Sequence, residues 1–314
     1  MGLTGAKVLV TGASGLIGRT LCERLLQKGA HVVALVRNAE RANDRLPRGC
    51  SVVLGDMTVP IECESGIDYI VHGAGPTVSR DFIEHPVGVI DAIVGGARNI
   101  LEFARKEAVK GLVFLSTMEV YGLTNSEDVD ESGYAALDTL LPRNCYPEAK
   151  RLAESLFVSA VKEYGVHARI ARLTQTFGRG VEKDDTRVFA EFARAVRDQR
   201  DIVLKSDGST ARCYCSVDDA VDAICLLLER GQDGMAYNVA NPETYCTIRE
   251  MAELVAREFS NGRSRVLIKQ ASVETCGYLP SFKMKLNVER LKALGWAPRH
   301  GLREMFAEIF YGWK

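Results

Sequence analysis

The sequence lacks the features that membrane-spanning, nucleic-acid-binding or secreted proteins usually show. None of its apolar runs approaches the roughly 20 residues that a membrane-spanning helix requires. Its 40 basic and 41 acidic side chains nearly cancel, to a formal net charge of −1, whereas nucleic-acid-binding proteins usually concentrate positive charge. The N-terminus runs directly into a strand-like segment at 7–11, with no basic-then-apolar leader. We therefore expect a cytosolic protein that binds neither a membrane nor a nucleic acid.

Paired cysteine motifs are also absent. The nine cysteines are odd in number, and no two of them form a Cys-x-x-Cys pair. This spacing favours neither a disulfide framework nor a zinc site. We expect small buried thiols in a reducing compartment, and no metal site.

Short apolar runs alternate with helical patterns through the first half of the chain. The runs lie at 8–10, 31–36, 51–54, 67–71, 111–116 and 168–173. Helical patterns lie at 16–27, 86–106 and 151–164. Continuous Val/Ile/Leu runs are typical of strands that are buried on both faces, as in a parallel sheet. The alternation predicts a doubly wound α/β fold of the Rossmann type.

The rhythm changes after about residue 175. Loops lengthen, and helical patterns at 188–197, 219–229 and 248–259 alternate with short strand-like runs. We therefore expect a dinucleotide-binding domain over residues 1–175, with room for a strand or helix returning from the second half. A smaller, mainly substrate-binding α/β portion over residues 176–314 would then close a cleft at the carboxyl ends of the strands.

A glycine-rich turn, TGASGLIG at 11–18, connects the first predicted strand to the first predicted helix. Glycines permit a tight turn and a close approach of the backbone to a pyrophosphate. The N-terminus of the helix adds free N–H groups and a partial positive charge. We predict that the dinucleotide phosphates contact Gly12, Ser14, Gly15, Leu16, Ile17 and Gly18.

Tyr146 and Lys150 form a Tyr-x-x-x-Lys pattern at the start of a predicted helix. A spacing of four places both side chains on one helical face. A phenol with a pKa of about 10 is a poor base at neutral pH, and a neighbouring ammonium group lowers that pKa. Tyr146 could then accept a proton from a substrate hydroxyl while the adjacent carbon gives hydride to a nicotinamide.

The glycine spacing, Gly-x-x-Gly-x-x-Gly, resembles that of the extended short-chain dehydrogenase/reductase family. STMEVYG at 116–122, about thirty residues before Tyr146, resembles the Ser/Thr-rich segment of that family, which also ends in Val-Tyr-Gly. Later segments resemble the nucleotide-sugar epimerases and dehydratases within it, so the resemblance covers essentially the whole chain. It implies an NAD(P)-dependent enzyme acting on a nucleotide sugar, and a homodimer formed through a four-helix contact of segments 87–106 and 148–164.

The resemblance also implies roles for individual residues. Asp56, with Met57 beside it, would contact the adenine, and Thr117 would supply the catalytic hydroxyl. The loop beside the cofactor ribose and phosphates corresponds to Gly73, Ala74 and Gly75. The nicotinamide end would be held by Ser116, Tyr146 and Lys150. Substrate would contact Met118, Gln175 and Arg212, the last through its diphosphate.

The end of the second predicted strand bears on the choice between NAD and NADP. An acidic residue there would bind the ribose hydroxyls and repel a 2′-phosphate, but Val36 occupies that position. Arg37 follows it, and either grips a 2′-phosphate as a bidentate donor or faces solvent. On this basis we expect NADP or NAD as the cofactor, with a slight preference for NADP.

Glu119 distinguishes between the reactions of the family. A Glu two residues after the Thr resembles sugar-nucleotide dehydratases and decarboxylases, and a carboxylate there could remove the carbon 5 proton after oxidation at carbon 4. The other reading is a capping acid. We therefore expect a nucleotide-sugar dehydratase, with Tyr146, Lys150, Thr117 and Glu119 as catalytic residues.

Two departures and several alternatives accompany this expectation. The dTDP-glucose 4,6-dehydratases carry an Asp where this chain has Met118, which cannot donate a proton. The related GDP-mannose dehydratases and UDP-glucuronate decarboxylases also lack that Asp, so dehydration stays open. Many relatives have Asn at Ala92 or Ile93. An epimerase, a decarboxylase or an NADPH-dependent ketosugar reductase is the alternative among enzymes. A non-catalytic dinucleotide sensor is the alternative outside them.

Overall fold

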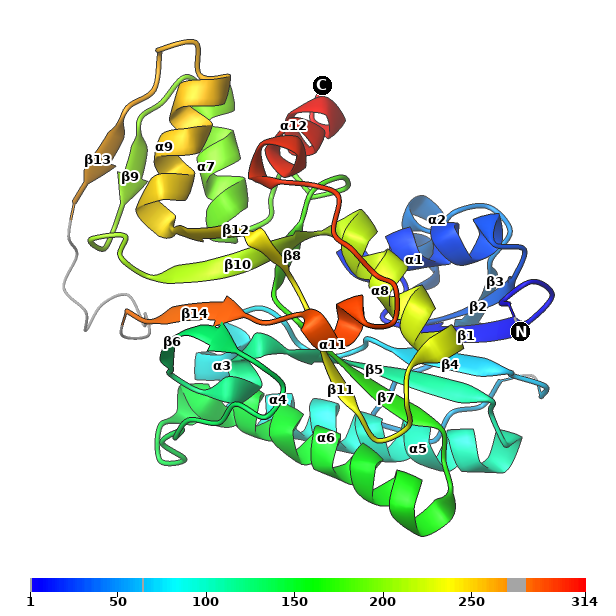
Figure 1. Cartoon of the computed structure of the whole chain (residues 1–314). Coiled ribbons are helices and arrows are strands. Elements are labelled where there is room, and N and C mark those ends of the chain that lie inside the picture. The colour runs from blue at the N-terminus through cyan, green and yellow to red at the C-terminus, as the bar shows by residue number, and fades with distance from the viewer. Residues whose placement is uncertain (1, 64, 270–280) are drawn as a thin grey trace.

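A computed structural model of the protein describes residues 2–63, 65–269 and 281–314 (Figure 1). Its largest element is a seven-stranded sheet in the order β11-β7-β5-β4-β1-β2-β3, in which every strand pair is parallel. The strands are β1 (Lys7–Thr11), β2 (His31–Val36), β3 (Ser51–Leu54), β4 (Tyr69–His72), β5 (Gly111–Thr117), β7 (Ala168–Leu173) and β11 (Ala236–Val239). The predicted doubly wound Rossmann fold is confirmed.

Helices cover both faces of this sheet (Figure 1). One layer contains α1 (Leu16–Gln27), α2 (Ala39–Arg45) and α8 (Val217–Arg230). The other contains α3 (Asp81–Glu84), α4 (Pro86–Ile90), a π-turn (Asp91–Gly95), α5 (Gly96–Glu107) and α6 (Cys145–Tyr164). Alternation along β1 separates two hydrophobic cores, because Val8 and Val10 face the α1 and α8 layer whereas Leu9 faces the α5 and α6 layer.

A second, smaller sheet has the order β12-β10-β14-β6, with β8 paired to β10. Its strands are β6 (Asn125–Val129), β8 (Gln175–Phe177), β10 (Ala211–Ser216), β12 (Asn241–Thr247) and β14 (Lys283–Leu286). A two-stranded sheet, β9 (Ile202–Leu204) with β13 (Val266–Ile268), lies in the same portion, together with α7 (Val188–Arg197), α9 (Ile248–Phe259), α11 (Glu289–Lys292) and α12 (Leu302–Gly312).

The second half of the chain also completes the large sheet. β11 pairs with β7 at its edge, and α8 contacts β5 and β7. The order of the strands reverses between β1 and β4, and in sheets of this kind ligands bind at the carboxyl ends of the strands beside such a reversal. The loops that follow β1, β4 and β5 therefore form the region in which the predicted site residues lie.

Within the described ranges, no helix is long and apolar enough to cross a membrane. The same ranges hold no group of three or more His, Cys, Asp or Glu side chains arranged to hold a metal ion. Of the eight described cysteines, five are buried and three are half-buried, while Cys276 lies outside the described residues.

Candidate active site

The turn between β1 and α1 requires glycine at two positions. Gly12 has a φ of 71°, and a Cβ there would lie 2.7 Å from the carbonyl oxygen of Gly73. A Cβ on Gly18 would collide with the carbonyl oxygen of Gly12. The absence of side chains therefore lets the loop after β4 pack directly against the start of α1.

The N-terminus of α1 is free to bind an anion. Gly15 precedes the helix without a side-chain cap, and its first turn holds no acidic residue. The N–H groups of that turn have no intrahelical acceptor, and the helix dipole adds positive charge there. Leu16 and Ile17 lie in this turn, and half-buried Ser14 lies beside it. This cradle has the shape and charge that a dinucleotide pyrophosphate needs.

Thr11 connects the first strand to the loop at 73–75. Its hydroxyl oxygen accepts from the backbone N–H groups of Gly73 and Ala74, at 3.2 and 3.1 Å. The hydroxyl must then donate to Nδ1 of His72, 2.8 Å away, so His72 carries its proton on Nε2. The following Gly75 has a φ of 158°. This network fixes the loop at the point where the strand order reverses.

His72 makes the stability of the fold sensitive to acid. Burial, together with the charge of Lys150, lowers its pKa from 6.5 to about 3. Between these two pH values the unfolded chain binds a proton that the folded chain excludes, so the free energy of unfolding falls as the pH drops below 6.5. In chemical denaturation at several pH values, we expect His72→Asn, which keeps an acceptor for Thr11, to reduce this loss. An equal loss in both proteins would contradict the assignment.

Arg37 and Asp56 lie close together at the ends of β2 and β3. The carboxylate of Asp56 accepts from the backbone N–H and the hydroxyl of Thr58, each at 2.9 Å. These bonds, with the charge of Arg37, lower the pKa of Asp56. Val36 is buried and Arg37 is exposed, while Met57 is buried and its carbonyl accepts from Asn99 at 2.7 Å.

Tyr146 lies in the first turn of α6, and its side chain is almost completely buried. It is hydrogen-bonded to Thr117, the last residue of β5. The ring of Phe82 stacks on it, with centroids 4.4 Å apart. Glu119 lies in the 3₁₀ turn that follows β5, where its backbone N–H donates to the Thr117 hydroxyl at 3.3 Å. The structure thus brings together the predicted catalytic hydroxyls and Glu119.

Arg143 was not predicted. It lies in a 3₁₀ turn, Pro142–Asn144, directly before α6. Its Nη1 donates to Oε2 of Glu119 at 2.6 Å, and its guanidinium lies 5.6 Å from the centroid of the Phe82 ring. The sequence signal was an arginine three residues before Tyr146, but only the fold shows that it faces Glu119.

The electrostatics around Tyr146 differ from the prediction. Burial raises the pKa of the phenol, the charge of Glu119 raises it further, and Thr117 and Arg143 oppose the shift. The ammonium of Lys150 instead donates to the carbonyl of Leu115 at 2.7 Å. In the structure, Thr117 and Arg143, and not the predicted Lys150, are the groups that lower the pKa of Tyr146.

Lys150 is itself perturbed. Burial lowers its pKa from 10.5 to about 8, and the charge of Glu154, one helical turn further on, opposes this shift. Glu154 accepts from the hydroxyl of Ser116 at 2.5 Å and from Nη2 of Arg172 at 2.7 Å. Since the Ser116 hydroxyl is engaged with α6, any contact that Ser116 makes with a cofactor would fall to its backbone.

The three predicted substrate residues differ in their surroundings. Met118 is buried, and the Thr174 hydroxyl lies 3.3 Å from its Sδ. Oε1 of Gln175 and Nε of Arg212 are buried and have no hydrogen-bond partner within the described part of the chain. Such orphaned polar atoms need a ligand or water to compensate their burial. Gln175 lies two residues beyond Leu173, which pairs with Thr117 across the sheet.

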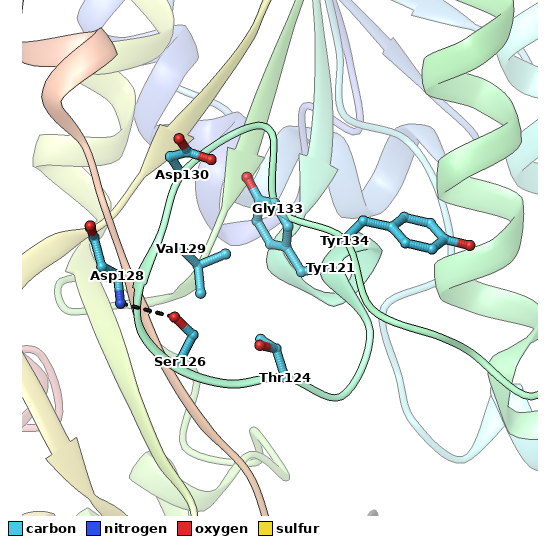
Figure 2. Close-up of a pocket in the computed structure, with 8 residues that line it drawn as sticks. All are labelled: Tyr121, Thr124, Ser126, Asp128, Val129, Asp130, Gly133 and Tyr134. Carbon is cyan, nitrogen blue, oxygen red and sulfur yellow. Dashed lines mark hydrogen bonds between the residues drawn. The ribbon is translucent and has the colours of Figure 1, made fainter.

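Ile93 stands in a π-turn, Asp91–Gly95. A Cβ added to Gly75 would lie 3.7 Å from Cγ1 of Ile93, so an apolar side chain meets the loop beside the predicted cofactor site. Whichever position corresponds to the Asn of relatives, Ala92 or Ile93, no amide is present to bond there. A separate cavity of about 170 Å³ lies within the loop that follows the Glu119 turn, and Figure 2 shows the residues that line it. It is lined by Tyr121, Thr124, Ser126, Asp128, Val129, Asp130, Gly133 and Tyr134.

Comparison with known proteins agrees with this geometry. Residues 8–240 match the family model described as the NAD dependent epimerase/dehydratase family. UDP-glucuronic acid decarboxylase 6 of Arabidopsis thaliana is 31% identical over 306 residues, which cover 95% of this chain and 86% of that protein. UDP-glucuronic acid decarboxylase 5 of the same plant is 30% identical over 305 residues, with the same coverage of both chains.

Solved structures share the fold at lower identity. A UDP-glucose 4-epimerase of Thermotoga maritima superposes with a TM-score of 0.85 at 20% identity, covering 98% of this chain and 100% of that one. A dTDP-glucose 4,6-dehydratase of Streptomyces venezuelae gives 0.80 at 22% identity, covering 98% of each chain. The family model matches residues 8–240, and the relatives align along nearly the whole chain. The chain therefore belongs to the NAD-dependent epimerase/dehydratase family of nucleotide-sugar-modifying enzymes.

Proposed function

We propose that this enzyme decarboxylates a nucleotide-linked hexuronic acid, with UDP-glucuronate as the first candidate. The curated relatives with 30–31% identity are UDP-glucuronic acid decarboxylases. The glycine-rich turn would hold a nicotinamide dinucleotide, which would supply reversible hydride transfer at carbon 4 of the sugar. Tyr146 would accept the proton of the 4-hydroxyl, Thr117 would hydrogen-bond that oxygen, and Lys150 would hold the nicotinamide ribose.

Oxidation at carbon 4 makes the carboxylate on carbon 5 a β-keto acid. The bond between carbons 5 and 6 then breaks, carbon dioxide leaves, and the electron pair passes to the 4-keto oxygen as an enolate. A proton from solvent water is then added at carbon 5. Tyr146 finally returns its proton to the oxygen on carbon 4, and the product is a nucleotide-linked pentose. Donors close to that oxygen stabilise the enolate.

Met118 is the observation that carries this proposal. Elimination of a hydroxyl needs an acid to protonate the leaving group, and the side chain in the corresponding position is a buried thioether beside Thr174. Carbon dioxide leaves without being protonated, so decarboxylation makes no demand on Met118.

Dehydration, the reaction first expected from Glu119, is the second candidate. Glu119 is partly exposed and lies within electrostatic reach of Tyr146, as a base for the carbon 5 proton would have to be. Its pairing with Arg143 favours a structural or binding role over proton removal, because an ion-paired carboxylate gives up a strong contact when it is protonated.

We also propose that NADP is accepted in preference to NAD. Support comes from the end of β2, where buried Val36 offers no carboxylate and exposed Arg37 follows it. The nearby Asp56 would remain available to the adenine, with its charge partly offset by Arg37.

A homodimer through the outer helices is part of the same proposal. Exposed apolar side chains on α4 and α6 support it, including Val87, Leu152 and Val158, which are 69, 54 and 41% exposed. Association through these helices would bury them, and light scattering would measure the resulting mass.

Mass spectrometry in deuterated water tests the reaction. The protein is incubated with UDP-glucuronate, UDP-glucose and dTDP-glucose, with NAD and NADP supplied in separate samples. We expect UDP-glucuronate to lose carbon dioxide and to gain one deuterium at carbon 5. Loss of water from a neutral sugar would favour dehydration, and an unchanged mass with a shifted retention time would favour epimerisation; either would overturn the proposal.

A further inference from the structure

Arg143, three residues before Tyr146, has guanidinium N–H groups that make no hydrogen bond to the described part of the protein. Its Nη1 binds Glu119, and no other hydrogen bond from its guanidinium is made to the described residues. The side chain is 15% exposed, so its remaining N–H groups are neither buried nor satisfied by the protein. A planar guanidinium can bind two carboxylates on different edges, and one edge of this one is open.

The position of Arg143 is fixed from three sides. The turn Pro142–Asn144 leads directly into α6, three residues before Tyr146. Glu119 holds one end of the guanidinium, and the ring of Phe82 lies against both Arg143 and Tyr146. A side chain restrained in this way loses little entropy when it binds a second anion.

Other cations around Tyr146 are already occupied. The Lys150 ammonium donates into the sheet, and Arg172 is engaged with Glu154. Arg151 donates to the carbonyls of Val120 and Ala135. Of the four cations Lys150, Arg172, Arg151 and Arg143, Arg143 is the one that can receive an anion without giving up a protein partner. Arg212, whose buried Nε also has no partner in the described part of the chain, is left to the diphosphate.

We propose that Arg143 determines specificity by binding the carboxylate on carbon 6 of the substrate. The inference rests on the proposed function, in which Tyr146 and Thr117 engage the oxygen on carbon 4. Carbon 6 is two carbons from carbon 4, and the Arg143 guanidinium is held between Glu119 and the Phe82 ring that stacks on Tyr146. The carboxylate of a uronate loses its hydrating water when it enters this site and needs a cation to compensate for that loss. A neutral hydroxymethyl group gains little binding free energy from a guanidinium.

Glu119 acquires a different role in this arrangement. It positions the guanidinium, yet its negative charge also opposes a second carboxylate on the same arginine. The two residues should therefore affect uronate binding in opposite directions. If the pair were only structural, removing either partner would have the same effect.

Binding measurements on the NADP-loaded protein separate these possibilities. Isothermal titration calorimetry with UDP-glucuronate and with UDP-glucose would be run in a Tyr146→Phe background, which prevents turnover. Because a charged hydrogen bond is lost, we expect Arg143→Gln to weaken UDP-glucuronate binding about 10- to 100-fold and UDP-glucose binding less than about 3-fold. Arg143→Lys, which keeps the positive charge, should weaken UDP-glucuronate binding less than Arg143→Gln does. Glu119→Gln should leave UDP-glucuronate binding unchanged or make it tighter. The matched control is Arg80→Gln. It removes a 77% exposed arginine that lies directly before α3, the helix that contains Phe82.

Two results would overturn the proposal. Equal weakening of both ligands by Arg143→Gln would show a structural role, as would a loss of uronate binding in Glu119→Gln that matches the loss in Arg143→Gln. If Arg143→Gln does not fold, Arg143→Lys and Glu119→Gln still decide the question. Selective uronate binding through Arg143 without release of carbon dioxide by the wild type would sink the proposed reaction and leave the binding site standing.

Discussion

Tyr146→Phe is expected to lower kcat about a thousandfold while the fold and the substrate affinity are retained. The variant removes the hydroxyl that would exchange a proton with the oxygen on carbon 4, and positioned acid–base groups contribute about 10²–10⁴ in rate. The stacking of Phe82 on the ring should survive, because a phenylalanine fills the same space against it. Steady-state release of carbon dioxide from UDP-glucuronate measures the loss.

Tyr311→Phe is the matched control for this variant, because Tyr311 is 78% exposed on α12. It should retain the wild-type rate. Activity of Tyr146→Phe within a few-fold of wild type, with an intact circular dichroism spectrum, would remove Tyr146 from the chemistry and leave it a packing residue.

Arg172→Met is expected to destabilise the fold by about 3–5 kcal/mol, the range found when one partner of a buried ion pair is removed. Arg172 and Glu154 expose 15 and 8% of their side chains, and the guanidinium also donates to the Tyr121 hydroxyl at 3.1 Å. Without it, the carboxylate of Glu154 is buried beside Ser116 with no ion-pair partner, and among the described residues only the charge of Lys150 remains to offset it. Urea denaturation measures the free energy of unfolding.

The double variant Arg172→Met/Glu154→Leu should be less destabilised than the single one, because no uncompensated charge remains. Arg80→Met removes an exposed ion pair with Glu84 and should change stability by less than about 1 kcal/mol. If Arg172→Met changed the free energy of unfolding as little as Arg80→Met does, the buried ion pair would make no net contribution to stability.

Six of the seven strands of the large sheet could be predicted because each is a short apolar run. The seventh, β11, was covered only by the expectation that left room for a strand or helix returning from the second half of the chain. β6 was not predicted, because its residues Asn125–Val129 are mostly polar and form no apolar run. This strand exists because it pairs with β14 more than 150 residues later, and a local pattern carries no record of such a partner. The helical pattern at 86–106 was found, but the π-turn that divides it at Asp91–Gly95 was not.

The pieces of the site were predictable where a motif fixes both residue type and spacing, as for Tyr146 and Lys150. Their electrostatics were not, because these depend on neighbours from distant segments. Arg143 faces Glu119 across 24 residues, and the carbonyl that binds Lys150 belongs to Leu115 on β5. Phe82 lay between predicted elements, and nothing in the local sequence placed its ring on Tyr146.

The return of β11 to the large sheet has a consequence for synthesis on the ribosome. Until residue 239 has emerged, β7 is an unpaired edge, and the apolar face that α8 covers is exposed to solvent. Exposed strand edges and apolar faces of nascent chains favour intermolecular association. The nucleotide-binding half is thus synthesised first but completed late, and a chaperone would have to protect that edge while some sixty residues beyond β7 are still being translated.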